Sequence, residues 1–160
     1  MKFYHKLYTA LSMNNLSQSH KTLFLNTLAF TICFACWTLN GVLVTFLVDS
    51  GIFNWSVVEV GWLLGIPILS GSIFRLPIGI LTDKFGGKIV FSILLLLCAI
   101  PLFLLPFATS FWSFAILSFL FGMVGTSFAV GIGFTSVWYP QHWQGRALGI
   151  FGMGNAGAAI

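Results

Sequence analysis

Long apolar runs separated by short polar segments cover most of this sequence. At 1.5 Å per residue, the first four runs are each long enough to cross the ~30 Å hydrocarbon core of a bilayer as a helix. The pattern predicts transmembrane helices over residues 22–48, 57–82, 89–107, 111–139 and 145–160, and the sequence ends within the last of them.

The polar segments between the runs carry signals for helix ends. Ser56 followed by Glu59 has the spacing of a capping box and marks the start of the second helix. Pro101 and Pro106 mark the far end of the third. Residues 1–21 are polar and basic without periodic apolar positions, so they predict a tail that stays on one side of the membrane.

Composition agrees with a membrane protein and excludes several other classes. The chain is 58% hydrophobic and 6% charged, whereas soluble domains carry about 25% charged residues. A net charge of +4, carried by scattered residues, does not indicate a nucleic-acid surface. The three histidines form no nucleophile–base pair and no metal-ligand spacing, so we expect no enzyme activity, no metal and no cofactor.

Cys33 and Cys36 have the spacing of a redox or zinc motif. They lie within an apolar run, and no second pair accompanies them. We therefore interpret them as buried thiols rather than as a metal or redox site.

Basic residues predict the orientation in the membrane. They fall before the first helix, between the second and third, and between the fourth and fifth, which are all on one side; they are Lys2, Lys6, Lys21, Lys84, Lys88 and Arg146. Asp49 and Glu59 occupy the opposite side, which carries no Lys or Arg. The positive-inside rule then predicts a multi-pass protein of the cell (inner) membrane with a cytoplasmic N-terminus.

Arg75 is the main candidate for chemistry. An arginine within an apolar helix costs about 2.5–3.5 kcal/mol on insertion scales, so such residues usually serve a function. Its planar fork of donors suits planar anions such as carboxylate, nitrate or phosphate. Pro67, Gly71, Arg75 and Gly79 recur every four residues, and the small residues leave room for a ligand beside the arginine.

An alternative is that Arg75 pairs with a carboxylate inside the helical bundle. The acidic residues are Asp49, Glu59 and Asp83, and all three lie near helix ends. Asp83 is about 12 Å along the helix from Arg75. The sequence therefore favours a substrate anion, although a carboxylate from another part of the protein stays possible.

Two further segments stand out. The turn Gly79-x-x-x-Asp83-Lys84-x-Gly86-Gly87-Lys88 places an aspartate at a helix C-terminus, where it needs a cation or another helix's N-terminus as partner. By charge alone this turn is equally well an ordinary positive-inside loop.

Small residues mark the fourth and fifth helices. Gly125, Ala129 and Gly133 recur every four residues, and Gly152, Gly154 and Gly157 crowd the fifth helix, which indicates close helix packing. Asn155, within the latter group, is a polar donor inside the membrane that is available to an anion.

The turn at residues 79–88 resembles the signature between helices two and three of the major facilitator superfamily. In that family this loop helps to latch the two halves of the transporter on the cytoplasmic side. The resemblance implies that role for Gly79, Asp83, Gly86 and Lys88.

A second resemblance is more specific. The Ser-Phe-Ala segment at 127–129, the Trp-Tyr-Pro segment at 138–140 and the glycine-rich segment at 144–157 resemble the nitrate signature region of nitrate/nitrite porters. Gly-Ser-x-x-Arg-x-Pro-x-Gly around Arg75 resembles the segment whose arginine binds nitrate in these porters. The resemblance implies that Arg75 binds the anion and that Phe128 and Asn155 lie near it.

Some positions depart from the porter pattern. Ser127 stands where many members have Asn, residues 130–133 replace a more polar run, and the glycine stretch before Asn155 is one residue shorter. These departures bear on which anion is bound.

Together these features predict an all-α transmembrane fold, with residues 22–160 forming the first five helices of an expected twelve. The expected function is secondary active transport of a small anion, nitrate or nitrite, by alternating access. A missing C-terminal half would supply a second arginine, and this chain is not expected to transport alone. The lack of a mid-membrane carboxylate favours nitrate/nitrite exchange over proton symport. A porter for another small anion or organic acid, or a non-transporting membrane sensor, remains an alternative.

Overall fold

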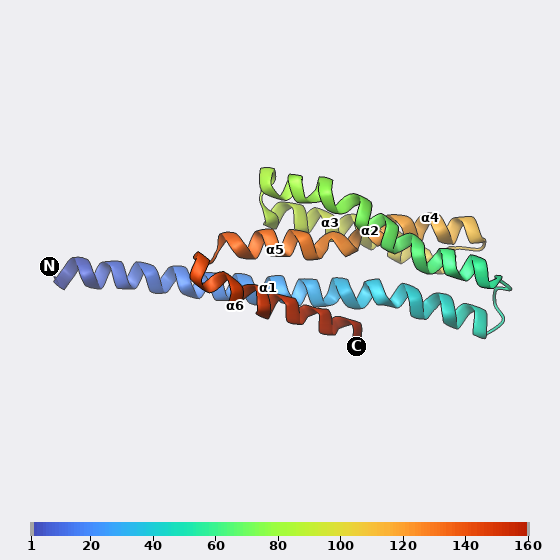
Figure 1. Cartoon of the computed structure of the whole chain (residues 1–160), viewed down its shortest axis with the longest axis horizontal. Coiled ribbons are helices and arrows are strands. Elements are labelled where there is room, and N and C mark those ends of the chain that lie inside the picture. Colours follow the sequence, from blue (N-terminus) through green and yellow to red (C-terminus); the bar gives the residue numbers. More distant parts are fainter. Residues whose placement is uncertain (1, 160) are drawn as a thin grey trace.

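The computed structural model describes residues 2–159, with side chains from Ser17 onward, and the described part is helical without strands. The elements are α1 (Lys2–Asp49), α2 (Val57–Phe85), α3 (Gly87–Leu104), η1 (Leu105–Phe107), α4 (Phe111–Gly122), η2 (Met123–Thr126), α5 (Ser127–Val137), α6 (Gln141–Gly152) and η3 (Met153–Ala159). In Figure 1, α6 and η3 run alongside α1, and α5 lies between α1 and the α2–α3 pair. α4 continues the line of α5 and packs on α2 and α3.

Four segments are long and apolar enough to cross a membrane, in agreement with the all-α transmembrane fold predicted from sequence. They cover Ser17–Asp49, Val57–Phe85, Gly87–Phe107 and Phe111–Val137. The predicted capping box also forms, because the Glu59 carboxylate accepts a hydrogen bond from the Ser56 backbone N–H at 2.8 Å. In the fourth span the 3-10 turn η2 separates α4 from α5.

Two helices begin at least four residues earlier than the apolar pattern indicates. α1 begins at Lys2 rather than near residue 22, so the basic segment continues the first helix. Residues 2–21 contain neither glycine nor proline, so nothing in their sequence breaks a helix there. α6 begins at Gln141, directly after Pro140. The sequence pattern missed this start because apolar residues appear only after the first helical turn.

Buried asparagines tie α1 to its neighbours. Asn26 donates from Nδ2 to the Gly131 carbonyl at 3.0 Å and to Thr135 Oγ1 at 2.7 Å. Asn40 donates to the Leu63 carbonyl at 3.3 Å and accepts from Ser118 at 3.0 Å. Such bonds fix helix pairs in an environment where no water competes for them.

The cysteines are free thiols. Cys33 and Cys98 are buried and Cys36 is half-buried. This agrees with the interpretation of the Cys33–Cys36 pair as packing residues.

Candidate anion-binding site

Arg75 lies in the middle of α2, and its side chain is exposed on the surface of the described part. Neighbouring Gly71 and Ile78 are buried, so Arg75 lies at the edge of the packed face of the helix. Within residues 17–159 its guanidinium has no hydrogen bond or ion pair. A guanidinium at this depth is therefore available to a group outside the described residues.

The depth of Arg75 relative to Phe128 follows from the contacts between α2 and the fourth span. Glycines of the fourth span meet α2 at three points along its length, Pro67–Gly122, Gly71–Gly125 and Thr82–Gly133. The residue numbers rise together, so the two segments run in the same direction. Arg75 is four residues beyond Gly71, about 6 Å, and Phe128 is three beyond Gly125, about 5 Å. The two residues therefore lie at nearly the same depth.

Phe128, half-buried at the start of α5, belongs to an aromatic cluster formed with Phe30 of α1 and Phe151 of α6. Its ring centroid is 5.4 Å from that of Phe30 and 6.0 Å from that of Phe151. Phe30 and Phe151 stack at 4.8 Å and are nearly inaccessible, with exposed fractions of 1% and 0%. The two buried rings hold the more accessible ring of Phe128 in place.

Asn155 is brought to the same level by the packing of η3 on α1. A Cβ on Gly154 would lie 2.5 Å from Phe30 Cδ1, so the backbone beside Asn155 touches the ring that packs on Phe128. Gly157, one turn further on, lies directly against the Thr31 carbonyl. The Asn155 side chain itself is exposed.

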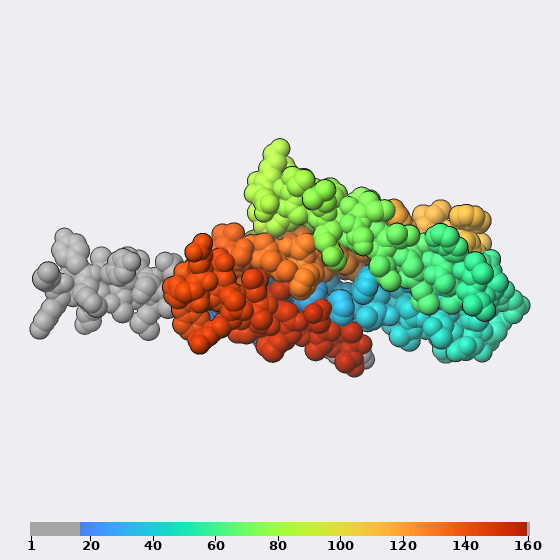
Figure 2. Space-filling view, viewed as in Figure 1, coloured from blue at the N-terminus to red at the C-terminus, as the bar shows by residue number. Residues whose placement is uncertain are grey.

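Arg75, Phe128 and Asn155 thus lie at about one depth, on three different segments of the bundle. In Figure 2 the surface is hollowed between α2 and the α6–η3 segment, and α1 is visible on its floor. A guanidinium, a primary amide and an aromatic face at one level form a set that suits a small planar anion.

The turn predicted to act as a latch lies at the end of α2. Gly86 has a φ of 85°, a left-handed conformation that favours glycine, and its N–H donates to the Thr82 carbonyl. Asp83 and Lys88 are exposed, and neither forms an ion pair within residues 17–159. Gly79 is half-buried, with no atom within 4 Å of the position that a Cβ would occupy. These residues are accessible to a partner outside the described part.

The residues of α5 that depart from the porter pattern, at 127 and 130–133, pack against other helices of this bundle. Ser127 is buried, with 1% of its surface exposed. Val130 is fully buried, and Gly131 packs against the Phe151 ring. Gly133 faces the Thr82 methyl group at 3.6 Å from the position of a Cβ. These changes therefore alter packing rather than a surface that an anion would touch.

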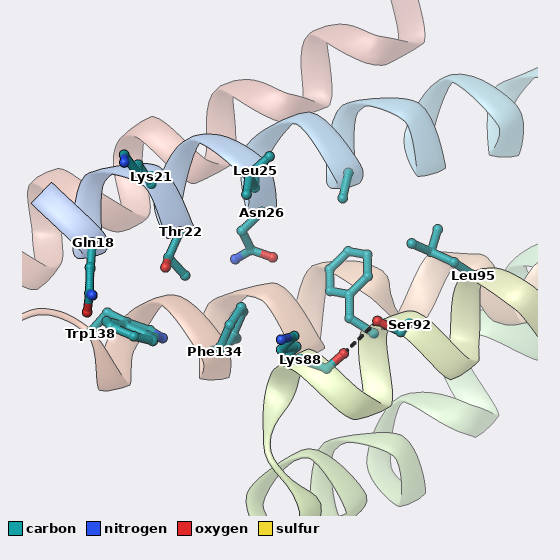
Figure 3. Close-up of a pocket in the computed structure, with 12 residues that line it drawn as sticks. Gln18, Lys21, Thr22, Leu25, Asn26, Lys88, Ser92, Leu95, Phe134 and Trp138 are labelled. Carbon is teal, nitrogen blue, oxygen red and sulfur yellow. Dashed lines mark hydrogen bonds between the residues drawn. The ribbon is translucent and has the colours of Figure 1, made fainter.

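A cavity of about 480 Å³ lies between α1, α3 and α5, near the start of α3 (Figure 3). Of the residues predicted for binding or latching, it is lined only by Lys88. Asn26 points into it from α1, but its amide already donates to Gly131 and Thr135. This cavity is therefore separate from the level of Arg75.

Sequence reasoning missed two residues of α1 that bear on the site. Phe30 joins Phe128 to the Asn155 segment, but one phenylalanine among 18 gives no signal in the sequence. Trp37 lies beside Gly125, and its buried indole N–H has no hydrogen-bond partner within the described residues. A tryptophan within an apolar run was the available signal, since buried indoles usually find an acceptor.

Comparison with known proteins gives one family and several relatives. The family model of the Major Facilitator Superfamily matches residues 25–160. The chain is 44% identical over 140 residues to the "Probable nitrate/nitrite antiporter NarK1" of Thermus thermophilus, covering 88% of this chain and 31% of that protein.

Two more distant relatives are also named for the transport of nitrate or nitrite. The "Probable nitrate/nitrite transporter NarK2" of Mycobacterium tuberculosis is 36% identical over 79% of this chain and 32% of its own length. The "Nitrite extrusion protein" of Bacillus subtilis is 29% identical over 91% of this chain and 36% of its own length. The chain spans about a third of the length of these relatives.

Proposed function

Because this chain belongs to the major facilitator superfamily, we propose that it forms the N-terminal part of a secondary transporter for nitrate and nitrite. Its relatives are named as nitrate/nitrite transporters, and the four apolar spans agree with a multi-pass membrane protein. The observation that carries the proposal is the common depth of Arg75, Phe128 and Asn155 on three neighbouring segments.

In this proposal the Arg75 guanidinium binds the anion through two parallel N–H groups. The Asn155 amide donates a further hydrogen bond, and the ring of Phe128, held by its two neighbours, limits the pocket on one side. The rest of the transporter supplies a second arginine opposite the first. Two cationic groups then balance the desolvation of an anion deep in the membrane.

Transport follows the alternating exposure of this level to the two sides of the membrane. In this proposal the protein lies in the inner membrane of the cell, with its N-terminus in the cytoplasm. The exposed turn with Gly79, Asp83, Gly86 and Lys88 then meets the other half and closes the cytoplasmic side.

Exchange of nitrate for nitrite is the favoured form of coupling. Among the described residues the carboxylates are Asp49, Glu59 and Asp83, all at helix ends, so none is a proton carrier at the level of Arg75. Exchange of one monovalent anion outside for another inside moves no net charge and requires no proton carrier.

The test is nitrate uptake into proteoliposomes that contain the complete transporter and are loaded with nitrite. Arg75→Lys keeps the charge but loses the planar fork, so we expect uptake to fall roughly tenfold or more. Arg146→Lys is the matched control, because Arg146 is exposed in α6 and lies over the Trp143 ring at 5.1 Å. This control should transport as the parent does.

Three other results would each replace part of the proposal. Uptake that needs a pH gradient and no internal nitrite indicates symport instead of exchange. A folded parent that moves neither anion indicates a porter for another small anion or an organic acid. Nitrate binding without flux indicates a sensor that kept the fold.

A further inference from the structure

A groove with a cavity of about 360 Å³ runs between α2 and α3 on the outside of the bundle. Its lining has no polar surface, and Met123 of η2 also lines it. Leu81, Ile93 and Leu97 on its walls have exposed fractions of 43%, 51% and 54%. It is therefore open to the surroundings along its length, not enclosed by this chain.

Both walls belong to segments that are long and apolar enough to span a membrane, so the groove lies at the depth of the hydrocarbon core. The wall residues of α3, from Ile89 to Leu97, span about 12 Å of the helix axis. An apolar groove of this length suits one extended acyl chain, and its lack of hydrogen-bonding groups excludes a polar ligand.

One end of the groove carries positive charge. Phe85 and Ile89 line that end, where α2 turns into α3. Lys84 Nζ lies 5.4 Å from the centroid of the Phe85 ring, which places an ammonium group at the mouth. The turn holds two lysines, Lys84 and Lys88, against one acid, Asp83. Lys88 lines the cavity on the α1 side, so Lys84 is the cation of this groove.

We propose that the α2–α3 groove binds one anionic phospholipid, with an acyl chain along its apolar walls and the phosphate beside Lys84. Basic pockets between transmembrane helices at the cytoplasmic surface are typical sites for acidic headgroups. This assignment rests on the proposed orientation, which puts the turn in the cytoplasm, but it does not depend on which anion is transported. The lipid would hold the α2–α3 hairpin that carries the predicted latch.

The test uses the complete transporter in phosphatidylcholine nanodiscs that contain phosphatidylglycerol, with the retained lipids counted by native mass spectrometry. Lys84→Gln removes the cation, and Ile93→Trp fills the groove. The control for the charge is Lys21→Gln, because Lys21 is another basic residue at the same membrane surface. The control for the groove is Leu96→Trp, because Leu96 on α3 is 70% exposed but does not line the groove. Size-exclusion elution identifies any variant that fails to fold.

We expect Lys84→Gln to lower bound phosphatidylglycerol roughly fivefold with little change in phosphatidylcholine. Ile93→Trp should lower the retention of both lipids, and neither control should lower either. An equal loss with Lys21→Gln overturns the proposal, because it indicates attraction to the membrane surface as a whole. Unchanged retention in folded Lys84→Gln and Ile93→Trp proteins also overturns it, because another helix or no ligand then occupies the groove.

Discussion

The glycines of the last segment differ in what lies opposite each of them. Gly154 touches Phe30, and Gly157 lies directly against the Thr31 backbone of α1. Gly152 has no atom within 4 Å of the position that a Cβ would occupy. The same residue type therefore has a packing role at two positions and a free surface at the third.

Gly157→Ala should destabilise the complete transporter by about 1–3 kcal/mol, because the opposing atoms are backbone and have no room to move. Gly152→Ala should leave stability unchanged or raise it slightly, since alanine favours the helix. Thermal unfolding of both variants in the same detergent measures the difference. Equal midpoints would show that η3 does not pack on α1 as closely as described.

At Asn155 the expected effect is on the anion rather than on folding, because the side chain is exposed. Asn155→Ala removes one donor and should weaken nitrate binding roughly two- to tenfold. Asn155→Asp places a negative charge at the same point and should abolish binding. Calorimetric titration of the complete transporter with nitrate tests both.

The matched control for Asn155 is Asn54→Asp, in the exposed loop between α1 and α2, which should bind normally. Normal binding by Asn155→Asp would remove this residue from the site.

At the scale of elements, buried amide bonds hold α1 in register with the fourth span. Asn26→Leu removes the bonds to Gly131 and Thr135 and should lower the free energy of unfolding by about 1–2 kcal/mol. Thr45→Val is the control, because Thr45 bonds only the Gly41 carbonyl of its own helix. Chemical unfolding of the complete protein compares them, and equal losses would mean that the Asn26 bonds do not tie the helices together.

The sequence predicts the elements of this fold better than it predicts their contacts. Apolar length determines whether a helix can cross a membrane, and the pair Ser56 and Glu59 is a local signal, so the transmembrane fold and the capping box were both predictable and are found. The early start of α1 and the 3-10 turn within the fourth span depend on the absence of a helix breaker and on tertiary packing. Neither changes the hydrophobic pattern.

Two residues of the candidate site could be predicted from sequence for a similar reason. Arg75 stands out because a charge in an apolar run is rare, and Asn155 because a polar side chain lies among glycines. Phe30 could not be identified, since its role arises from contacts across three segments. The roles of Arg75, Phe128 and Asn155 remain predictions.

For the whole molecule, the orientation predicts which loops face each side of the membrane. In intact cells, a single cysteine at Asn54 or Thr109 should react with a membrane-impermeant maleimide, and one at Gln141 should react only after permeabilisation. The native cysteines Cys33, Cys36 and Cys98 are first replaced by alanine. The reverse labelling pattern would place the N-terminus outside the cell.

The backbone contact between Gly122 and Pro67 also has a mechanical consequence. A Cβ on Gly122 would lie 2.5 Å from the Pro67 Cα, and one turn further on a Cβ on Gly71 would lie 3.1 Å from the Gly122 carbonyl oxygen and 3.6 Å from the Gly125 Cα. Helices in backbone contact at successive turns cannot slide past one another without separating. The segments that carry Arg75 and Phe128 should therefore move as one rigid lever. A spin-label distance measured between α2 and α5 should stay constant through the transport cycle, while distances from either helix to the other half change.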